Sequence, residues 1–313
     1  MSACLLINHA RPEKTWRALD ALQGCDPLFL FCDGPKNNPD KTAQVKALLL
    51  ETGKARQKAG LQTAMMLLEE NLGCCNGPLA AIKWFFENNP EGHVIEDDIL
   101  VHPAFFPIHQ RALETHRTGP FLWIAEGHPL PNCPTALLET QMCRLVAWSA
   151  WSKPTLQIIE KSQKTTSPWK THGWKLLAGL HPKTQIFLWK EFNKLEKQPN
   201  WSWHYKLLQI QLELQRTGLT PTARLHENLG LDGSGHNCQN VFGAHENWDE
   251  NEIQGLLAKT AQPAKIKTWE RKMETQRYGR IRQSIGRKLL KLTPTPWKSL
   301  WKPVGAVGAA GSN

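Results

Sequence analysis

The chain has 313 residues, of which 41% are hydrophobic and 21% charged, so a globally disordered protein is excluded and there is enough apolar material for one large α/β domain or two smaller ones. The formal net charge is +10, and the segment 264–302 accounts for all of it, with twelve Lys and Arg against two Glu. The preceding 263 residues are formally neutral, so nucleic-acid binding by the whole chain loses its main support.

No stretch approaches the apolar length of a membrane span, and only a short apolar run precedes Asn8. We therefore expect a cytoplasmic protein without a signal peptide. The eight cysteines show no CxxC pair and no zinc-ligand spacing, which favours reduced, mostly buried thiols. For the adjacent pair Cys74 and Cys75, packing beside a turn is favoured over a redox or metal role.

The N-terminal part of the chain alternates apolar runs with helical patterns. Pro12 suits the first turn of a helix, and the turn residues Asp33 to Pro35 follow the second apolar run. This alternation predicts an α/β fold with a mostly parallel sheet flanked by helices on both faces. We expect strands at 3–8, 27–32, 61–68 and 93–101, and helices at 13–22, 41–52 and 77–86.

Three consecutive carboxylates, Glu96 to Asp98, interrupt the apolar stretch from His93 to Val101. Like charges packed together repel each other, so these acids need either a bound cation or full solvation. For this tripeptide taken alone, a metal site and an acidic surface turn stay equally open.

Polar residues also follow the other expected strands, at Asn8 to Arg11, at Asp33 with Gly34, and at Asn71 to Gly73. Parallel strands of an α/β sheet end at one edge, and ligands of such sheets bind there. We therefore expect these residues and the three acids to form one site.

The order of these motifs resembles that of the GT-A glycosyltransferases, in particular bacterial sugar transferases related to N-acetylglucosaminyltransferase I. The likeness covers about residues 3–240 and includes a Trp-rich stretch of the acceptor half and a closing Gly/His segment. The motifs that carry it are Asn8 to Pro12, Asp33 to Pro35, Asn71 to Cys74, Glu96 to Asp98, Ala147 to Trp151, Glu227 to Gly230 and Asp232 to His236.

The resemblance implies a nucleotide-sugar donor and a divalent metal, Mn²⁺ or Mg²⁺, which offsets the charge of the departing diphosphate. It implies that Asp98 ligates the metal and that His236, in a glycine-rich loop, swings onto the metal or the phosphates as part of a lid. A turn-forming Asp33 and a surface Arg11 are the alternatives to a donor role for these two residues. The donor contacts implied by the resemblance are Arg11, Asp33, Asn71, Gly73, Glu96 and Asp97.

The general base departs from the family pattern. In the related inverting enzymes an Asp follows a Trp in the acceptor half, whereas here Trp203 is followed by His204. Imidazole can remove a proton near neutral pH, so His204 is the first candidate base. The other candidates are Asp232, Glu227 and Glu126, and a changed activity stays open.

Fourteen Trp against two Tyr is an unusual ratio, and the Trp residues crowd the middle of the chain. Indole faces stack on sugar rings, although most Trp side chains pack in cores. We expect Trp148, Trp151 and Trp203 to contact a glycan or lipid-linked acceptor.

Three parts are expected: a nucleotide-sugar-binding half at 1–130, an acceptor half at 131–245, and a basic extension at 246–313. Within the extension, apolar residues from Tyr278 to Leu292 recur every three or four positions among Lys and Arg, which predicts a basic amphipathic helix. Such a helix suits an anionic membrane surface at the cytoplasmic face, where lipid-linked acceptors lie. A helix packed on its own domain is the alternative.

Two other functions stay open. A nucleotidyltransferase has a related sheet and acidic metal site, but it would carry a glycine-rich phosphate loop after the first strand, and residues 8–13 contain no glycine. A noncatalytic adaptor could bind membrane or nucleic acid through 264–302 on an inactive transferase fold, and the unexpected His204 keeps this alternative open.

Overall fold

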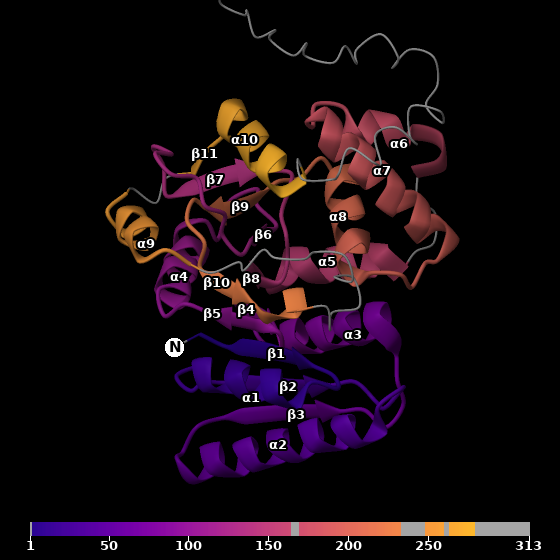
Figure 1. The fold of residues 1–313 in the computed structure, drawn as a ribbon, viewed down its shortest axis with the longest axis vertical. Helices are drawn as coiled ribbons and strands as arrows, with labels where there is room; N and C mark the ends of the chain where they lie inside the picture. The colour runs from indigo at the N-terminus through magenta and orange to yellow at the C-terminus, as the bar shows by residue number, and fades with distance from the viewer. Residues whose placement is uncertain (1, 164–168, 233–247, 260–262, 279–313) are drawn as a thin grey trace, which may run out of the picture.

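A computed structural model describes residues 2–163, 169–232, 248–259 and 263–278 (Figure 1). Strands and helices alternate along the first hundred or so residues, as the sequence predicts. The strands of the described chain are β1 (Cys4–Asn8), β2 (Leu28–Cys32), β3 (Thr63–Leu67), β4 (Glu91–Glu96), β5 (Ile99–Val101), β6 (Trp123–Ile124), β7 (Leu137–Thr140), β8 (Ala147–Trp151), β9 (Gly218–Pro221), β10 (His226–Asn228) and β11 (Pro263–Ala264).

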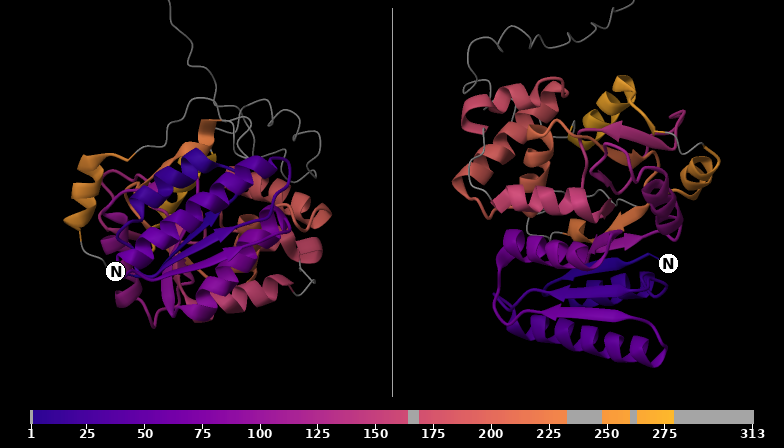
Figure 2. Two further views of the ribbon diagram at one scale, coloured as in Figure 1. Left: turned by 90° about the horizontal axis from the view of Figure 1, so that it is seen from below. Right: turned by 180° about the vertical axis from the view of Figure 1, so that it is seen from behind.

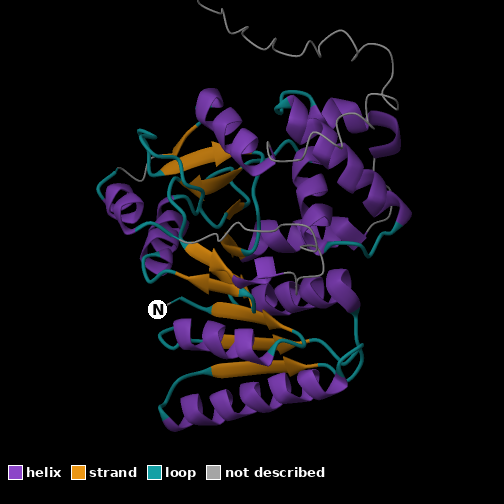
Figure 3. Cartoon of the chain, viewed as in Figure 1, coloured by secondary structure: helices purple, strands orange, loops and turns teal. Residues whose placement is uncertain are grey.

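The helices cover both faces of the sheet, as the views in Figures 2 and 3 show. The α-helices of the described chain are α1 (Pro12–Ala21), α2 (Pro39–Lys58), α3 (Gly73–Asn88), α4 (Phe105–Thr115), α5 (Ser152–Gln163), α6 (Trp169–Leu177), α7 (Pro182–Lys197), α8 (Trp203–Glu213), α9 (Glu250–Leu257) and α10 (Lys267–Tyr278), and a short 3-10 helix, η1, spans Leu229–Asp232.

Nine strands form one sheet in the order β11-β7-β9-β6-β8-β4-β1-β2-β3, and β10 pairs with β5 in a separate ribbon. Strands β3, β2, β1 and β4 are parallel neighbours. Antiparallel pairings appear only beyond β4 in the main sheet of the described chain, where β8 joins both β4 and β6, and β7 joins β9. The predicted α/β fold with a mostly parallel, helix-flanked sheet is confirmed.

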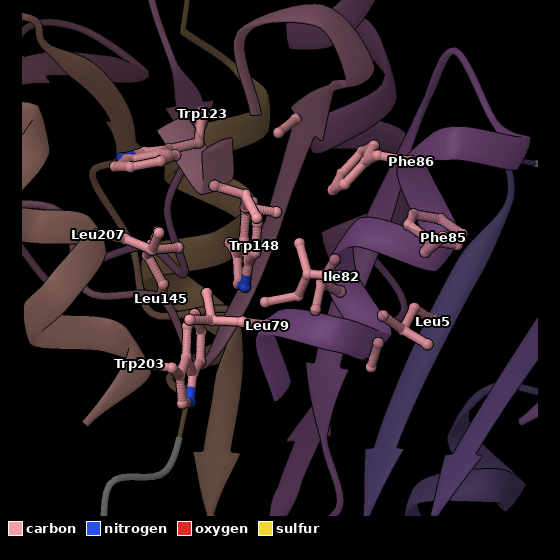
Figure 4. Packing of buried hydrophobic residues seen from close by; sticks show 14 of the residues in the cluster. Leu5, Leu79, Ile82, Phe85, Phe86, Trp123, Leu145, Trp148, Trp203 and Leu207 are labelled. Atoms are coloured by element: carbon pink, nitrogen blue, oxygen red, sulfur yellow. The ribbon is translucent and has the colours of Figure 1, made fainter. Parts of the chain in front are cut away.

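The core has one layer on each face of the sheet because alternate residues of a strand point to opposite faces. Leu5 and Ile7 of β1 face the layer under α3, whereas Leu6 faces the layer under α1 and α2. Figure 4 shows the first layer, in which Leu79 and Ile82 of α3 lie between β1 and Trp148 of β8. Helix α8 packs against this layer through Trp203, Leu207 and Ile210.

Three elements differ most from their expected bounds. Helix α2 continues to Lys58, six residues beyond its expected end. Helix α3 begins at Gly73, four residues before the expected start, because backbone amides at its start donate to the distant carboxylate of Asp33. The expected strand at 93–101 is two strands, since the chain turns at Asp97 and Asp98 and β5 leaves the main sheet to pair with β10. The acids therefore lie in a turn at the end of a buried strand.

The expected C-terminal extension contributes several elements to the fold. Strand β11 pairs with β7, and Met273 of α10 is fully buried. Two carboxylates of α10 bind the domain: Glu274 accepts a hydrogen bond from the His181 backbone N–H, and Glu270 accepts one from the Thr140 hydroxyl. The expected amphipathic helix falls, except for Tyr278, outside the described residues.

Within the described ranges, no helix combines the length and the apolar character needed to cross a membrane.

Candidate functional site

The carboxyl ends of β1, β2 and β4 lie side by side at one edge of the sheet. In the register of the parallel strands, Ile7 lies opposite Glu96, and Asn8 lies opposite Cys32. The residues that immediately follow these strands are therefore neighbours, because they leave the sheet at the same level. This register brings together the segments that carry Arg11, Asp33 and the three acids.

Arg11 binds both aspartates of the acidic turn. Its Nη1 atom lies 2.8 Å from Asp97 Oδ1 and 2.6 Å from Asp98 Oδ2. The second oxygen of Asp97, Oδ2, accepts a hydrogen bond of 3.2 Å from the backbone N–H of His9. A buried carboxylate with two charge-assisted partners is held in one orientation.

Burial and mutual repulsion make the ionised form of these acids costly. Burial and, after it, the nearby Asp98 carboxylate raise the pKa of Glu96 to about 8, although Arg11 and a hydrogen bond from the Trp203 side chain oppose the rise. Burial also raises the pKa of Asp97 to about 6, although Arg11 opposes this shift. For Arg11 itself, burial lowers the pKa, but Asp97 and Asp98 outweigh burial and hold it above its ordinary value. A further cation near these oxygens would stabilise the ionised acids.

Asp33 organises the loop that leads into α3. Its Oδ1 accepts hydrogen bonds of 2.9 Å from the backbone N–H groups of Gly34 and Leu72, and its Oδ2 accepts one of 3.0 Å from the N–H of Gly73. Gly73 has φ of +83°, a backbone conformation that favours glycine. Asp33 therefore has a structural role in addition to any contact with a ligand.

Asn71 binds the same loop from the other side. Its Nδ2 donates to the Gly34 carbonyl at 2.7 Å. A Cβ atom at position 34 would lie 2.2 Å from the Glu70 carbonyl carbon, so only glycine allows the two segments to approach this closely. Asp33, Asn71 and Gly73, which were predicted to contact the donor, thus connect the loop at Gly34 with the loop at 70–73.

The residues that position Asp98 were not predicted from the sequence. The Asp98 carbonyl accepts a hydrogen bond from Leu229 N–H, and Lys14 Nζ donates to the Leu229 carbonyl, both at 2.8 Å. A Cβ atom on Gly230 would lie 2.3 Å from Asp98 Oδ2. The Asn228–Gly230 turn had appeared only as part of a closing motif, and no local signal linked it to Asp98.

The acceptor candidates occupy different environments. Trp148 has no exposed surface, and Trp151 and Trp203 are also buried, so none of the three presents an open indole face. Trp148 and Trp203 stack on each other with ring centroids 6.4 Å apart, and Figure 4 shows both inside the packed layer. Trp203 is nevertheless close to the acids, since its side chain hydrogen-bonds Glu96.

Two of the candidate bases, His204 and Glu126, contact consecutive residues, Cys143 and Arg144. His204 Nε2 lies 3.3 Å from the Cys143 carbonyl oxygen. Glu126 is only 1% exposed, and its carboxylate lies 3.6 Å from Arg144 Nε. Glu227 is in β10, and Asp232 ends η1. The predicted metal ligand His236 falls outside the described residues.

An open pocket of about 430 Å³ lies next to the start of α3. Its lining residues are Cys74 and the loop 198–201. The thiol of Cys74 donates to the Trp201 carbonyl at 3.3 Å. This pocket thus lies between the start of α3 and the segment that leads into α8.

A divalent cation fits the chemistry of the acidic turn. The described residues contain no preassembled group of three or more His, Cys, Asp and Glu side chains around one point. The Asp97 and Asp98 carboxylates instead converge on the cationic Arg11, and carboxylate oxygens are the donors that Mg²⁺ and Mn²⁺ prefer.

The comparisons with known proteins are distant. No family model and no curated protein matches the chain. The S. aureus TarS fragment 1–349 is 12% identical, with 52% of this chain and 49% of that chain covered and a TM-score of 0.36. This chain thus matches about half the length of that fragment.

Two nucleotide-utilising enzymes show comparable likenesses. The 4-diphosphocytidyl-2C-methyl-D-erythritol synthase of Anaerococcus prevotii is 9% identical, covers 53% of this chain and 77% of its own, and has a TM-score of 0.35. A UDP-glucose pyrophosphorylase complexed with UDP-glucose is 11% identical, covers 82% and 98%, and has a TM-score of 0.38. Because these TM-scores are below 0.5, the likenesses carry no argument, and the α/β fold rests on the strand pairings of this chain.

Proposed function

We propose that the chain is a metal-dependent glycosyltransferase of the GT-A type, related to the N-acetylglucosaminyltransferase I group. The observation that carries this proposal is the convergence of Arg11, Asp97 and Asp98 at the end of β4, beside the Asp33 loop. A buried acidic turn in which burial raises the pKa values of Glu96 and Asp97, at the carboxyl edge of a parallel sheet, suits a nucleotide diphosphate and its metal.

In this proposal Asp98 holds the divalent cation, Mn²⁺ or Mg²⁺, with His236 as a further ligand. The cation, when bound, would neutralise charge on the diphosphate leaving group. Asp97 and Glu96 would contact the ribose, the sugar or metal-bound water, and Asp33, Asn71 and Gly73 would position the nucleoside. The backbone amides of Leu72 and Gly73 are already occupied by Asp33, so the loop is ordered before the donor arrives.

His204 is the proposed general base. A carbonyl oxygen only accepts hydrogen bonds, so in the contact with Cys143 the His204 Nε2 atom carries the hydrogen and Nδ1 is the basic nitrogen. Glu126 and Asp232 remain the second choices. Inversion of configuration and a glycan or lipid-linked acceptor belong to the same proposal.

A nucleotidyltransferase is the second candidate, since the same acidic turn could serve that reaction. The reaction products distinguish a glycosyltransferase from a nucleotidyltransferase. A glycosyltransferase releases a nucleoside diphosphate from a nucleotide sugar, whereas a nucleotidyltransferase releases pyrophosphate from a nucleoside triphosphate and a sugar phosphate. Assays for both products, with Mn²⁺ and a panel of nucleotides, should yield only nucleoside diphosphate. Pyrophosphate release that depends on Asp98 would establish the alternative instead.

We also propose peripheral association with an anionic membrane through the basic C-terminal segment. Residues 279–313 contain seven Lys and Arg and no Asp or Glu. Each basic residue near an anionic bilayer contributes about 1 kcal/mol, so seven of them are enough for electrostatic attachment.

A further inference from the structure

Arg11 occupies the position between the two aspartates that a bridging cation would take. A single nitrogen, Nη1, lies 2.8 Å from Asp97 Oδ1 and 2.6 Å from Asp98 Oδ2. Two carboxylates that converge on one point normally share a cation there, because their mutual repulsion otherwise drives them apart. In this structure the shared cation is the guanidinium of Arg11.

The acids are held more firmly than Arg11. Asp97 is bound by the His9 backbone N–H, and the Asp98 main chain is bound by Leu229. Their side chains are 6% and 13% exposed, whereas the Arg11 side chain is 29% exposed. Arg11 also immediately precedes α1 and makes no capping hydrogen bond with its side chain. The guanidinium can therefore rotate toward solvent while the carboxylates stay in place.

We propose that Arg11 is a resident cation which a divalent ion must displace, and that the displaced guanidinium then binds the diphosphate of the nucleotide. This inference rests on the proposed function and assigns Arg11 as the residue that couples metal binding to nucleotide binding. Without nucleotide, displacement leaves Arg11 without an anionic partner, so the metal alone binds weakly. With nucleotide, the phosphate oxygens replace the aspartates as partners of Arg11.

This arrangement makes the binding of the two ligands cooperative. A coupling between two sites is reciprocal, and typical couplings change affinity about 5-fold to 150-fold. Removal of the Arg11 charge should therefore strengthen the binding of the metal alone and, at the same time, weaken the coupling between metal and nucleotide.

The test is a calorimetric titration of the full-length protein with Mn²⁺ alone, repeated in the presence of UDP, GDP, ADP or CDP. Arg11→Gln should bind Mn²⁺ alone about tenfold more tightly than the wild type, and nucleotide should raise its Mn²⁺ affinity less than that of the wild type. Arg11→Lys keeps the charge on a compact ammonium that bridges two carboxylates less well, and should fall between the two. Arg17→Gln is the matched control, since Arg17 is exposed on α1, the helix that Arg11 precedes, and it should behave as the wild type.

Equal or weaker Mn²⁺ binding by Arg11→Gln, or no Mn²⁺ binding by either protein, overturns the inference. Thermal unfolding without metal shows whether Arg11→Gln is folded. If it is not, the Mn²⁺ titration of Arg11→Lys tests the inference instead. The Mn²⁺-only titration tests Arg11, whereas the nucleotide arms test the proposed function. Tighter Mn²⁺ binding by Arg11→Gln without any nucleotide binding would thus support the displacement of Arg11 by the metal, and would contradict both the proposed function and the binding of the guanidinium to the diphosphate.

Discussion

Asp33 is the residue whose structural role is most direct. Its carboxylate accepts three backbone hydrogen bonds, from Gly34, Leu72 and Gly73. In Asp33→Asn, the amide nitrogen would face at least one of these N–H donors and leave it unsatisfied in a buried site. The free energy of unfolding should fall by about 2–3 kcal/mol, measured by denaturant titration.

Asp20→Asn is the control for the Asp33 variant. Asp20 is exposed on α1 and accepts a hydrogen bond only from the Gln23 side chain among those the structure records for it. Its substitution should change stability by less than about 0.5 kcal/mol. Equal effects of the two substitutions would show that Asp33 does not hold the loop.

Gly230 should control the position of the Asp98 carboxylate. An added Cβ would lie 2.3 Å from Asp98 Oδ2, and the flexible end of the aspartate would have to shift. Gly230→Ala should therefore lower the affinity for Mn²⁺ with nucleotide about tenfold or more while the fold is retained.

Gly255→Ala is the matched control for Gly230. Position 255 in α9 has no atom within 4 Å of an added Cβ, so the change should leave ligand affinity unaltered and stabilise the helix by about 0.5–1 kcal/mol. If Gly230→Ala also left the Mn²⁺ affinity unaltered, the turn at Gly230 would have no role in metal binding.

The sequence allowed the residues of the acidic turn to be predicted, but not their partners. Asp97 and Asp98 are visible as adjacent acids after an apolar run, and Arg11 as a residue after another strand. The single nitrogen that joins them, and the contact between Asp98 and Gly230, depend on segments far apart in the chain. Local patterns carry no information about such contacts.

At the scale of secondary-structure elements, α4 packs on the sheet through a buried polar group. Ser149 Oγ of β8 lies 2.6 Å from His93 Nδ1 of β4 and 2.8 Å from His109 Nδ1 of α4. Burial lowers the pKa of His93 to about 3, and burial and the neighbouring His93 lower the pKa of His109 well below its usual value. Phe105 stacks on His109.

These pKa shifts predict how stability changes with pH. The unfolded histidines bind protons below about pH 6.5, whereas the folded ones do not, so stability is full above that pH and falls as the pH drops toward 3. Each histidine contributes a slope of about 1.4 kcal/mol per pH unit within this window. Denaturant titrations of His109→Phe between pH 6 and 4 should show a decline shallower by about that amount. An unchanged slope would mean that His109 is already protonated in the folded protein.

The bounds of the elements were predictable where local patterns determine them. Strands β1, β2 and β4 follow from short apolar runs that end in turn residues. The start of α3 was not predictable, since it depends on the Asp33 carboxylate 40 residues away in sequence from Gly73. The division of the stretch 93–101 into β4 and β5 likewise depends on the pairing of β5 with β10.

At the scale of the whole molecule, the fold was predictable up to β4 and was not predictable beyond it. The regular alternation of strands and helices up to β4 specifies a parallel sheet. Beyond it, β6 has two residues and β8 is rich in Trp, so neither shows a strand-like alternation of polar and apolar residues. The burial of the Trp residues was also not predicted, because indole side chains pack in protein cores and also stack on sugar rings.

The C-terminal segment can be removed without loss of the packed elements if the cut is placed after α10. Deletion of 279–313 keeps Met273 and the Glu274 contact, whereas deletion from 264 would remove both. The shorter deletion should abolish flotation with anionic liposomes and leave the thermal unfolding temperature unchanged. Equal flotation of the full-length protein and of the variant without 279–313 would exclude membrane binding by this segment. Neutral liposomes are the control for charge.

The central claim is that the acidic turn binds a nucleotide sugar together with a metal. Its most direct measurement is thermal unfolding with a panel of nucleotide sugars, with and without Mn²⁺, for the wild type and for Asp98→Ala. At about 100 times the dissociation constant, binding stabilises by about 2.7 kcal/mol, which raises the unfolding temperature of a 313-residue chain by roughly 4 °C. The wild type should show this shift with at least one nucleotide sugar, only with Mn²⁺, and Asp98→Ala should lose it. The absence of any Mn²⁺-dependent shift in the wild type, or an equal shift in Asp98→Ala, would contradict the account.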